Sequence, residues 1–170
     1  MEKRKRIAVL CTLDTKSEHA AFVARIIEDR GHAAVLIDIG VLGEPGGASG
    51  VAATITRRDI ADAAGANLDA LVAAKDRGSA LAVMAAGAAA TVTRLERDGA
   101  LDGVIGLGGG SGTAVASAAM RALPVGFPKV MISTMPQIAA APLAMTLRRI
   151  GFIPIMSVIV LTMTMSRVPT

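Results

Sequence analysis

The sequence predicts an α/β fold, a Rossmann-like open parallel sheet with helices on both faces. Four short apolar runs show no polar alternation, which is typical of strands that are covered on both faces. Segments with helical spacing of apolar residues separate these runs, and a glycine-rich turn precedes the last of these helices. Strands that alternate with helices form right-handed parallel units, and such units build an open, doubly wound sheet.

The first third of the chain contains one complete strand-helix-strand unit. Residues 7–11 are an unbroken apolar run and predict a strand. Apolar residues recur at helical spacing from 17 to 30, and Gly31 follows where a helix C-cap belongs. A second strand is expected at 33–37, followed by Asp38 and a loop at 40–50 that contains five glycines.

The middle of the chain is expected to be helical, and two further strands follow it. Apolar spacing predicts helices at 57–64, 68–75 and 79–98, the last of them stopped by Gly99. A third strand is expected at 104–107, with its helix at 111–122. The fourth strand is expected at 129–133, after a turn that contains two prolines.

Composition narrows the class of protein. The 170 residues suffice for one domain or slightly more. A single cysteine excludes an internal disulfide, and the N-terminus lacks a secretory pattern, so a cytoplasmic protein is expected. The net charge of +4 and the 2% of aromatic residues argue against nucleic-acid binding. The uncharged stretch 152–165 near the C-terminus is too short for a membrane span.

The stretch 103–113, GVIGLGGGSGT, is the strongest indication of a ligand. It is expected to run from a strand through a glycine loop into a helix, with Ser111 and Thr113 as capping residues. Glycines let the backbone approach a ligand, and free N–H groups at a helix start attract an anion such as phosphate. A tight turn without a ligand is the alternative, but it would need fewer glycines.

Ligands bind an open parallel sheet at the carboxyl ends of its strands, and four polar segments are expected there. A glycine-rich cradle for phosphate, the point charge of Lys16 and several hydroxyls resemble the inventory of a nucleotide site. Asp14 and Asp38 are the candidates to hold Mg²⁺ or a ribose. Residues 12–16 have an alternative role as a helix start, with Asp14 or Thr15 as the cap. The candidate binding residues are Thr12, Asp14, Thr15, Lys16, Asp38, Gly108, Gly109, Gly110, Ser111, Gly112, Thr113, Ser133 and Thr134.

The spacing of residues argues against three specific binding or catalytic motifs. No lysine follows a glycine, so the chain has no P-loop. The G-x-G-x-x-G pattern fails at its last glycine from either possible start, which disfavours NAD. Both histidines precede Ser111, which argues against a serine hydrolase of the nucleophile-elbow type. No general base is identifiable, so the sequence leaves open whether the protein is an enzyme.

Five segments together resemble a known family. Residues 12–16, 38–45, 106–113, 120–126 and 128–135 resemble the ATP-binding domain family named after the tomato mosaic virus resistance protein, in order and with natural spacing. The resemblance implies that 1–135 form a Rossmann-like N-terminal domain that binds ATP, with a second domain following in full-length members. It places the nucleotide at 12–16, Asp38, 108–113 and 133–135, and it supplies no reaction.

Residues 136–170 depart from this resemblance, since they are apolar and contain no acidic residue. This tail is expected either to complete the sheet or to form an interface, which predicts a homo-oligomer. The preferred function is ATP binding with Mg²⁺. The alternatives are a non-catalytic interaction or oligomerisation module and an enzyme that acts on a small phosphorylated metabolite.

Overall fold

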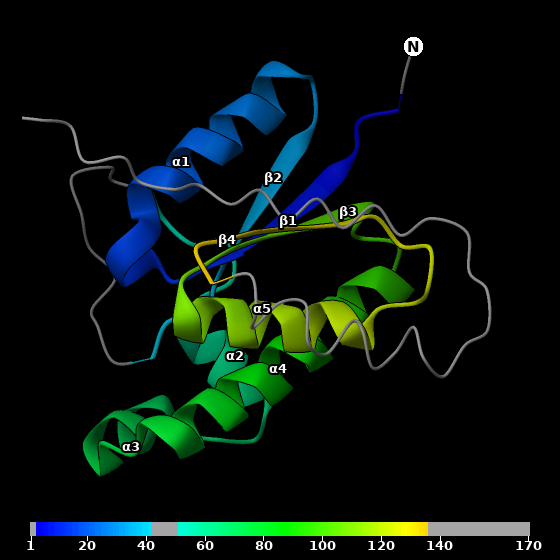
Figure 1. Cartoon of the computed structure of the whole chain (residues 1–170). Coiled ribbons are helices and arrows are strands. Elements are labelled where there is room, and N and C mark those ends of the chain that lie inside the picture. The colour runs from blue at the N-terminus through cyan, green and yellow to red at the C-terminus, as the bar shows by residue number, and fades with distance from the viewer. Residues whose placement is uncertain (1–2, 42–50, 136–170) are drawn as a thin grey trace, which may run out of the picture.

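The computed structural model describes residues 3–41 and 51–135 and has the α/β fold class expected from the sequence. Figure 1 shows a parallel sheet with helices on both faces. The elements in chain order are β1 (Arg6–Cys11), α1 (Leu13–Asp29), β2 (Ala33–Asp38), α2 (Arg57–Ala63), α3 (Leu68–Ala74), α4 (Arg77–Arg97), β3 (Gly103–Gly108), α5 (Gly110–Ala122) and β4 (Lys129–Ser133).

The described sheet has the strand order β2-β1-β3-β4, and every neighbouring pair is parallel. Val9 of β1 lies opposite Leu36 of β2 and Ile105 of β3, so β1 is paired on both edges. The chain runs from β1 outward to β2, and it then returns to β3 and continues outward to β4. The strand order therefore reverses between β1 and β3, and this switch point is where open α/β sheets bind ligands.

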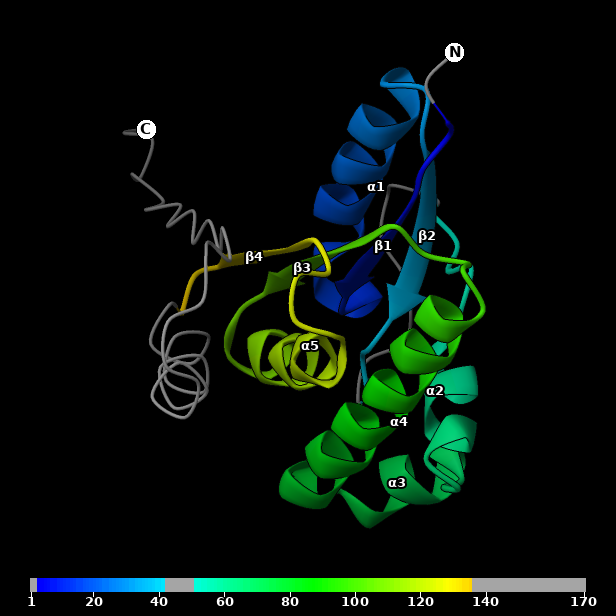
Figure 2. The same ribbon diagram turned by 90° about the vertical axis from the view of Figure 1, so that its right-hand side faces the viewer.

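The two faces of the sheet have separate apolar cores. Val9 of β1 packs with the α1 residues Ala20 and Ile27 on one face. Leu10, the next residue of β1, belongs to the core that includes α2, α4 and α5 on the other face. This alternation follows from the two-residue period of a strand. Figures 1 and 2 show α1 on one side of the sheet, and α4 and α5 side by side on the other.

Two helix starts differ from those expected. Helix α1 begins at Leu13 rather than at residue 17, because 13–15 form a first turn that the apolar spacing did not reveal. Lys16 has non-helical angles (φ −132°, ψ 21°) and offsets this turn from the rest of α1. Helix α4 begins at Arg77 rather than at residue 79, because the Asp76 side chain accepts hydrogen bonds from the first turn.

Within the described residues, one helix is long and apolar enough to cross a membrane, namely α4. This is weak evidence for a span, because a core helix of a globular domain meets the same criteria. Helix α4 packs against α5 and α2 in this structure. The expectation of no membrane partner stays a prediction, and the expected tail at 136–170 lies outside the described residues.

Candidate functional site

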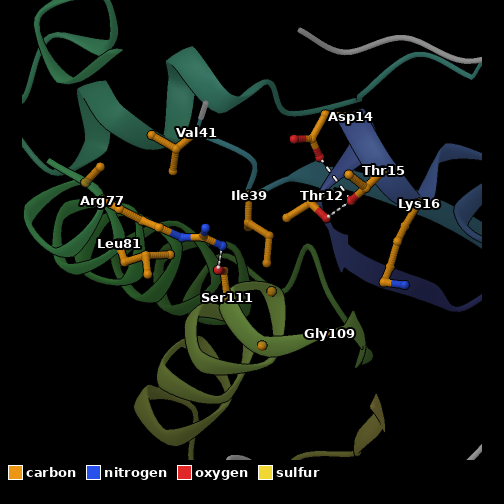
Figure 3. Close-up of a pocket in the computed structure, with 13 residues that line it drawn as sticks. Thr12, Asp14, Thr15, Lys16, Ile39, Val41, Arg77, Leu81, Gly109 and Ser111 are labelled. Carbon is orange, nitrogen blue, oxygen red and sulfur yellow. Dashed lines mark hydrogen bonds between the residues drawn. The ribbon is translucent and has the colours of Figure 1, made fainter. Parts of the chain in front are cut away.

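A pocket of about 500 Å³ lies at the switch point between β1 and β3 (Figure 3). Its size falls within the range of small-molecule sites, roughly 300–1,000 Å³. The start of α1, the segment that follows β2, the first turn and a half of α4 and the start of α5 contribute to its walls. The lining residues are Thr12, Asp14, Thr15, Lys16, Ile39, Val41, Arg77, Ala80, Leu81, Gly109, Gly110, Ser111 and Gly112.

The structure brings most of the candidate residues from the sequence to this pocket. Those that line it are Thr12, Asp14, Thr15, Lys16, Gly109, Gly110, Ser111 and Gly112. The other candidates, Asp38, Gly108, Thr113, Ser133 and Thr134, lie outside its lining. Several of these hold the pocket's walls in place, as the contacts below show.

The start of α5 carries no side-chain cap, which corrects the expectation that Ser111 and Thr113 cap it. The N-cap position belongs to Gly109, which has no side chain to accept a hydrogen bond from the first-turn N–H groups. Within the helix, the Thr113 N–H donates to the Gly109 carbonyl (3.1 Å) and opens the regular series. The preceding N–H groups, at Gly110, Ser111 and Gly112, have no intrahelical acceptor and belong to residues that line the pocket.

The glycines of this stretch serve two different purposes. A Cβ at Gly108 would overlap the Thr113 backbone, and one at Gly106 would lie 3.0 Å from the Cβ of Ala116 in α5, so both glycines allow α5 to approach the sheet. A Cβ at Gly110 would meet no described atom within 4 Å. Packing therefore explains Gly106 and Gly108, but it does not explain Gly110.

Thr113 and Ser133 form a buried contact behind the glycine loop. Their hydroxyl oxygens lie 2.7 Å apart, and both residues are almost fully buried. The Ser133 hydroxyl also accepts a bond from the Met135 N–H (2.9 Å), and the Thr134 N–H donates to the Gly108 carbonyl (3.1 Å). These bonds fasten the ends of β3 and β4 to α5, so these hydroxyls support the loop from behind.

Asp38 ties the start of α1 to the end of β2. Its Oδ1 accepts a hydrogen bond from the Leu13 N–H (3.1 Å) and one from the Gly40 N–H (2.9 Å). The side chain is 2% exposed, and burial raises its pKa above the ordinary value, although the two amide bonds oppose this effect. Asp38 therefore acts on the pocket through the backbone that it holds.

Asp14 and Thr15 lie inside the first turn of α1, which corrects the expectation that either of them caps it. The N-cap is Thr12, whose side chain makes no capping bond. Its hydroxyl instead lies 2.9 Å from the Thr15 hydroxyl, and Thr15 Oγ1 donates to Asp14 Oδ1 (3.2 Å). This small polar network lies along one wall of the pocket (Figure 3).

The carboxylates near the pocket suit Mg²⁺ only when a phosphate supplies further oxygen ligands. The described residues contain no group of three or more His, Cys, Asp or Glu side chains that could hold a metal. Asp14 presents a carboxylate to the pocket, whereas Oδ1 of Asp38 is already engaged by two amides. Mg²⁺ keeps several waters and is commonly bound by one or two carboxylates plus substrate phosphates. Asp14 fits that role.

Sequence reasoning missed the pocket's second wall. Arg77, at the start of α4, reaches across so that its Nη2 donates to the Ser111 hydroxyl (2.8 Å). The other missed lining residues are Ile39, Val41, Ala80 and Leu81. Asp76 offered the one local signal, since an Asp before a helical segment marks a helix start and would have placed Arg77 in the first turn.

Cys11 at the end of β1 does not supply a nucleophile. It is fully buried, and burial together with the nearby Asp38 raises the pKa of its thiol to about 12. The thiol therefore stays protonated at neutral pH, whereas a reactive cysteine needs the thiolate.

Comparison with known proteins gives relatives of much greater length. A UPF0261 protein of Clostridium tetani is 45% identical over 131 residues, which cover 77% of this chain and 31% of the relative. A UPF0261 protein of Brucella suis is 41% identical over 129 residues, covering 76% of this chain and 30% of the relative. The chain thus spans about a third of the length of these relatives.

A tomato protein matches over a shorter segment. The ToMV susceptible protein tm-1(GCR26) of Solanum lycopersicum is 47% identical over 58 residues, which are 34% of this chain and 8% of that protein. The family model matches a far larger part. Because residues 5–146 match the N-terminal domain of the uncharacterised protein family UPF0261, the chain belongs to this family.

Proposed function

We propose that this domain binds ATP together with Mg²⁺ in the pocket at the switch point. One observation carries the proposal: the uncapped, glycine-lined start of α5 opens into a pocket large enough for a nucleotide. Unpaired N–H groups and the helix dipole at such a start attract a phosphate.

Two cationic side chains add to this attraction. Lys16 and Arg77 both line the pocket, and Figure 3 shows them on opposite sides of the α5 start, where Gly109 and Ser111 are labelled. A chain of phosphates carries negative charge along its length, so it can contact cations that lie on opposite sides of the α5 start. This arrangement favours a polyphosphate ligand.

Asp14 gives the pocket a site for Mg²⁺ beside the phosphates. Its carboxylate would repel a bare polyphosphate, and a bound Mg²⁺ would neutralise part of both charges. ATP binding is therefore expected to depend on Mg²⁺. We limit the proposed function to binding, because no described side chain of the pocket has surroundings that would make it a general base.

Isothermal titration of the chain with ATP, ADP, NAD and a sugar phosphate, each with and without Mg²⁺, tests the proposal. The expected result is Mg²⁺-dependent binding of ATP, weaker binding of ADP, and no measurable binding of NAD. Preference for the sugar phosphate would instead support an enzyme of phosphorylated metabolites, and an absence of binding to all four ligands would reject the proposal.

A further inference from the structure

The pocket has two chemically different halves. Thr12, Thr15 and Lys16 from the start of α1 lie on one side in Figure 3, Val41 and Leu81 lie on the other, and Ile39 lies between them. Arg77 extends between Val41 and Leu81 to Ser111. One half therefore offers hydroxyls, the Asp14 carboxylate and the Lys16 cation, whereas the other half offers aliphatic surface that the Arg77 side chain crosses.

The aliphatic half is built on the core of the domain. Ile39 is 1% exposed, Val41 is 7% exposed and Ala80 is 1% exposed, and all three belong to the core cluster on this face of the sheet. Leu81 is half-buried and packs against the same cluster. Packed residues of this kind hold their positions but expose little area. Most of the apolar surface that this wall offers to a ligand therefore comes from Leu81.

A site for inorganic phosphate alone would not need such a wall. Apolar surface that faces water gains free energy when a ligand covers it, and polar ligand groups gain nothing there. None of the described residues that line the pocket is aromatic, so a planar ligand group would pack against aliphatic side chains instead of stacking on a ring.

We propose that the aliphatic wall binds the nucleoside part of the ligand, and that Leu81 is a residue that determines specificity for it. This inference rests on the proposed function and adds the orientation of the ligand. The phosphates lie toward Lys16 and the α5 start, and the base and sugar lie toward Ile39 and Leu81. Arg77, which reaches Ser111 from the first turn of α4, stands where the two parts of the ligand join.

Comparison of ATP with inorganic tripolyphosphate separates the two halves. Tripolyphosphate carries the same phosphate chain without the nucleoside, so it should contact Lys16, Arg77 and the α5 start without covering Leu81. Replacing Leu81→Ala should weaken the binding of Mg-ATP by about tenfold, the lower range for removing apolar contacts from a pocket. The same change should alter the affinity for Mg-tripolyphosphate by less than twofold.

Leu95→Ala is the matched control, because Leu95 lies on the same helix and is also half-buried against the same core cluster. It should leave both affinities unchanged, and it reports on any general loss of packing in α4. Leu81→Val is a milder second variant that removes one carbon atom from the wall. It should weaken Mg-ATP by a few fold and leave Mg-tripolyphosphate unaffected.

The possible outcomes separate this inference from the proposed function. If the parent chain binds ATP and tripolyphosphate equally tightly, or if Leu81→Ala weakens both equally, the orientation is wrong although the phosphate site stands. If the parent chain binds neither ligand, the proposed function fails and the inference fails with it.

Discussion

The starts of α1 and α5 lie at the same pocket but are built in opposite ways. At α1, a buried carboxylate from Asp38 accepts the Leu13 N–H, and Asp14 adds a second negative charge in the first turn. At α5, the N-cap is Gly109, no side chain caps the helix, and the first turn contains no acidic residue. Carboxylates compensate the positive end of the helix dipole at α1, whereas no described side chain does so at α5.

This difference assigns a separate role to each helix start. Two carboxylates offset the positive end of the α1 dipole, so that end is a poor site for an anion and a better one for a cation. The α5 start keeps its positive end and its N–H groups available. We therefore expect phosphate at α5, with Asp14 of α1 facing the Mg²⁺ that accompanies it.

A substitution that blocks the α5 start is expected to have the largest effect on ATP binding. Gly110→Val should abolish detectable ATP binding, because the side chain would occupy the space through which phosphate reaches the N–H groups. The fold should survive, since no described atom lies within 4 Å of a Cβ at this position. Calorimetric titration with Mg-ATP measures the loss.

Ala114→Val is the control for Gly110→Val. Ala114 is exposed on α5 and does not line the pocket, so this change introduces the same β-branched residue without closing the site. It should bind ATP as the parent chain does. Normal ATP binding by Gly110→Val would show that the α5 start is not the phosphate site.

The fold class was predictable because its strands are buried on both faces. Residues such as Val9 and Leu10 contribute to opposite cores, so β1 needs apolar residues at consecutive positions and leaves an unbroken run in the sequence. The start of α1 was missed because its first turn, with Asp14 and Thr15, has no apolar periodicity. Hydrogen bonds from outside the helix hold that turn in place.

The pocket was only partly predictable, because sequence spacing reports local structure. The glycine run indicated a close backbone approach, but only the folded structure separates Gly108, which packs against Thr113, from Gly110, which faces open space. Arg77 is 34 residues from Ser111 in the chain, and their contact depends on how α4 packs beside α5. No local pattern could have revealed it.

Removing the Asp38 carboxylate tests its role in holding the α1 start. Asp38→Ala should lower the free energy of unfolding by about 1–3 kcal/mol, because two buried N–H groups, of Leu13 and Gly40, lose their acceptor. Urea denaturation measures the change. Asp62→Ala, at an exposed position of α2, should lower the free energy of unfolding much less. An equal loss of stability in the two variants would show that Asp38 does not stabilise the α1 start.

A substitution of Lys16 tests whether its positive charge contributes to phosphate binding. Lys16→Ala should weaken ATP by about tenfold, the size of one charge-assisted contact, and leave adenosine almost unaffected. Lys3→Ala removes the same charge at an exposed position outside the pocket and should change neither affinity. If Lys16→Ala weakens adenosine as much as ATP, Lys16 does not contact the phosphates.

The smallest expected effect is the pH dependence that Asp38 gives to the stability. Burial raises the pKa of Asp38, so the folded chain holds this proton more tightly than the unfolded chain does. Its contribution to stability is therefore fully present below the unfolded pKa, about 4, and is lost as the pH rises through the folded pKa.

Asp38→Asn isolates this contribution, because the amide oxygen can still accept both N–H groups and does not titrate. Relative to this variant, the parent chain should be most stable below the unfolded pKa of about 4 and should lose that advantage as the pH rises above it, as measured by urea denaturation across the range. Asp59→Asn should show the opposite trend, because hydrogen bonds from Thr56 lower the pKa of Asp59. The same trend in both variants would mean that burial does not govern the ionisation of Asp38.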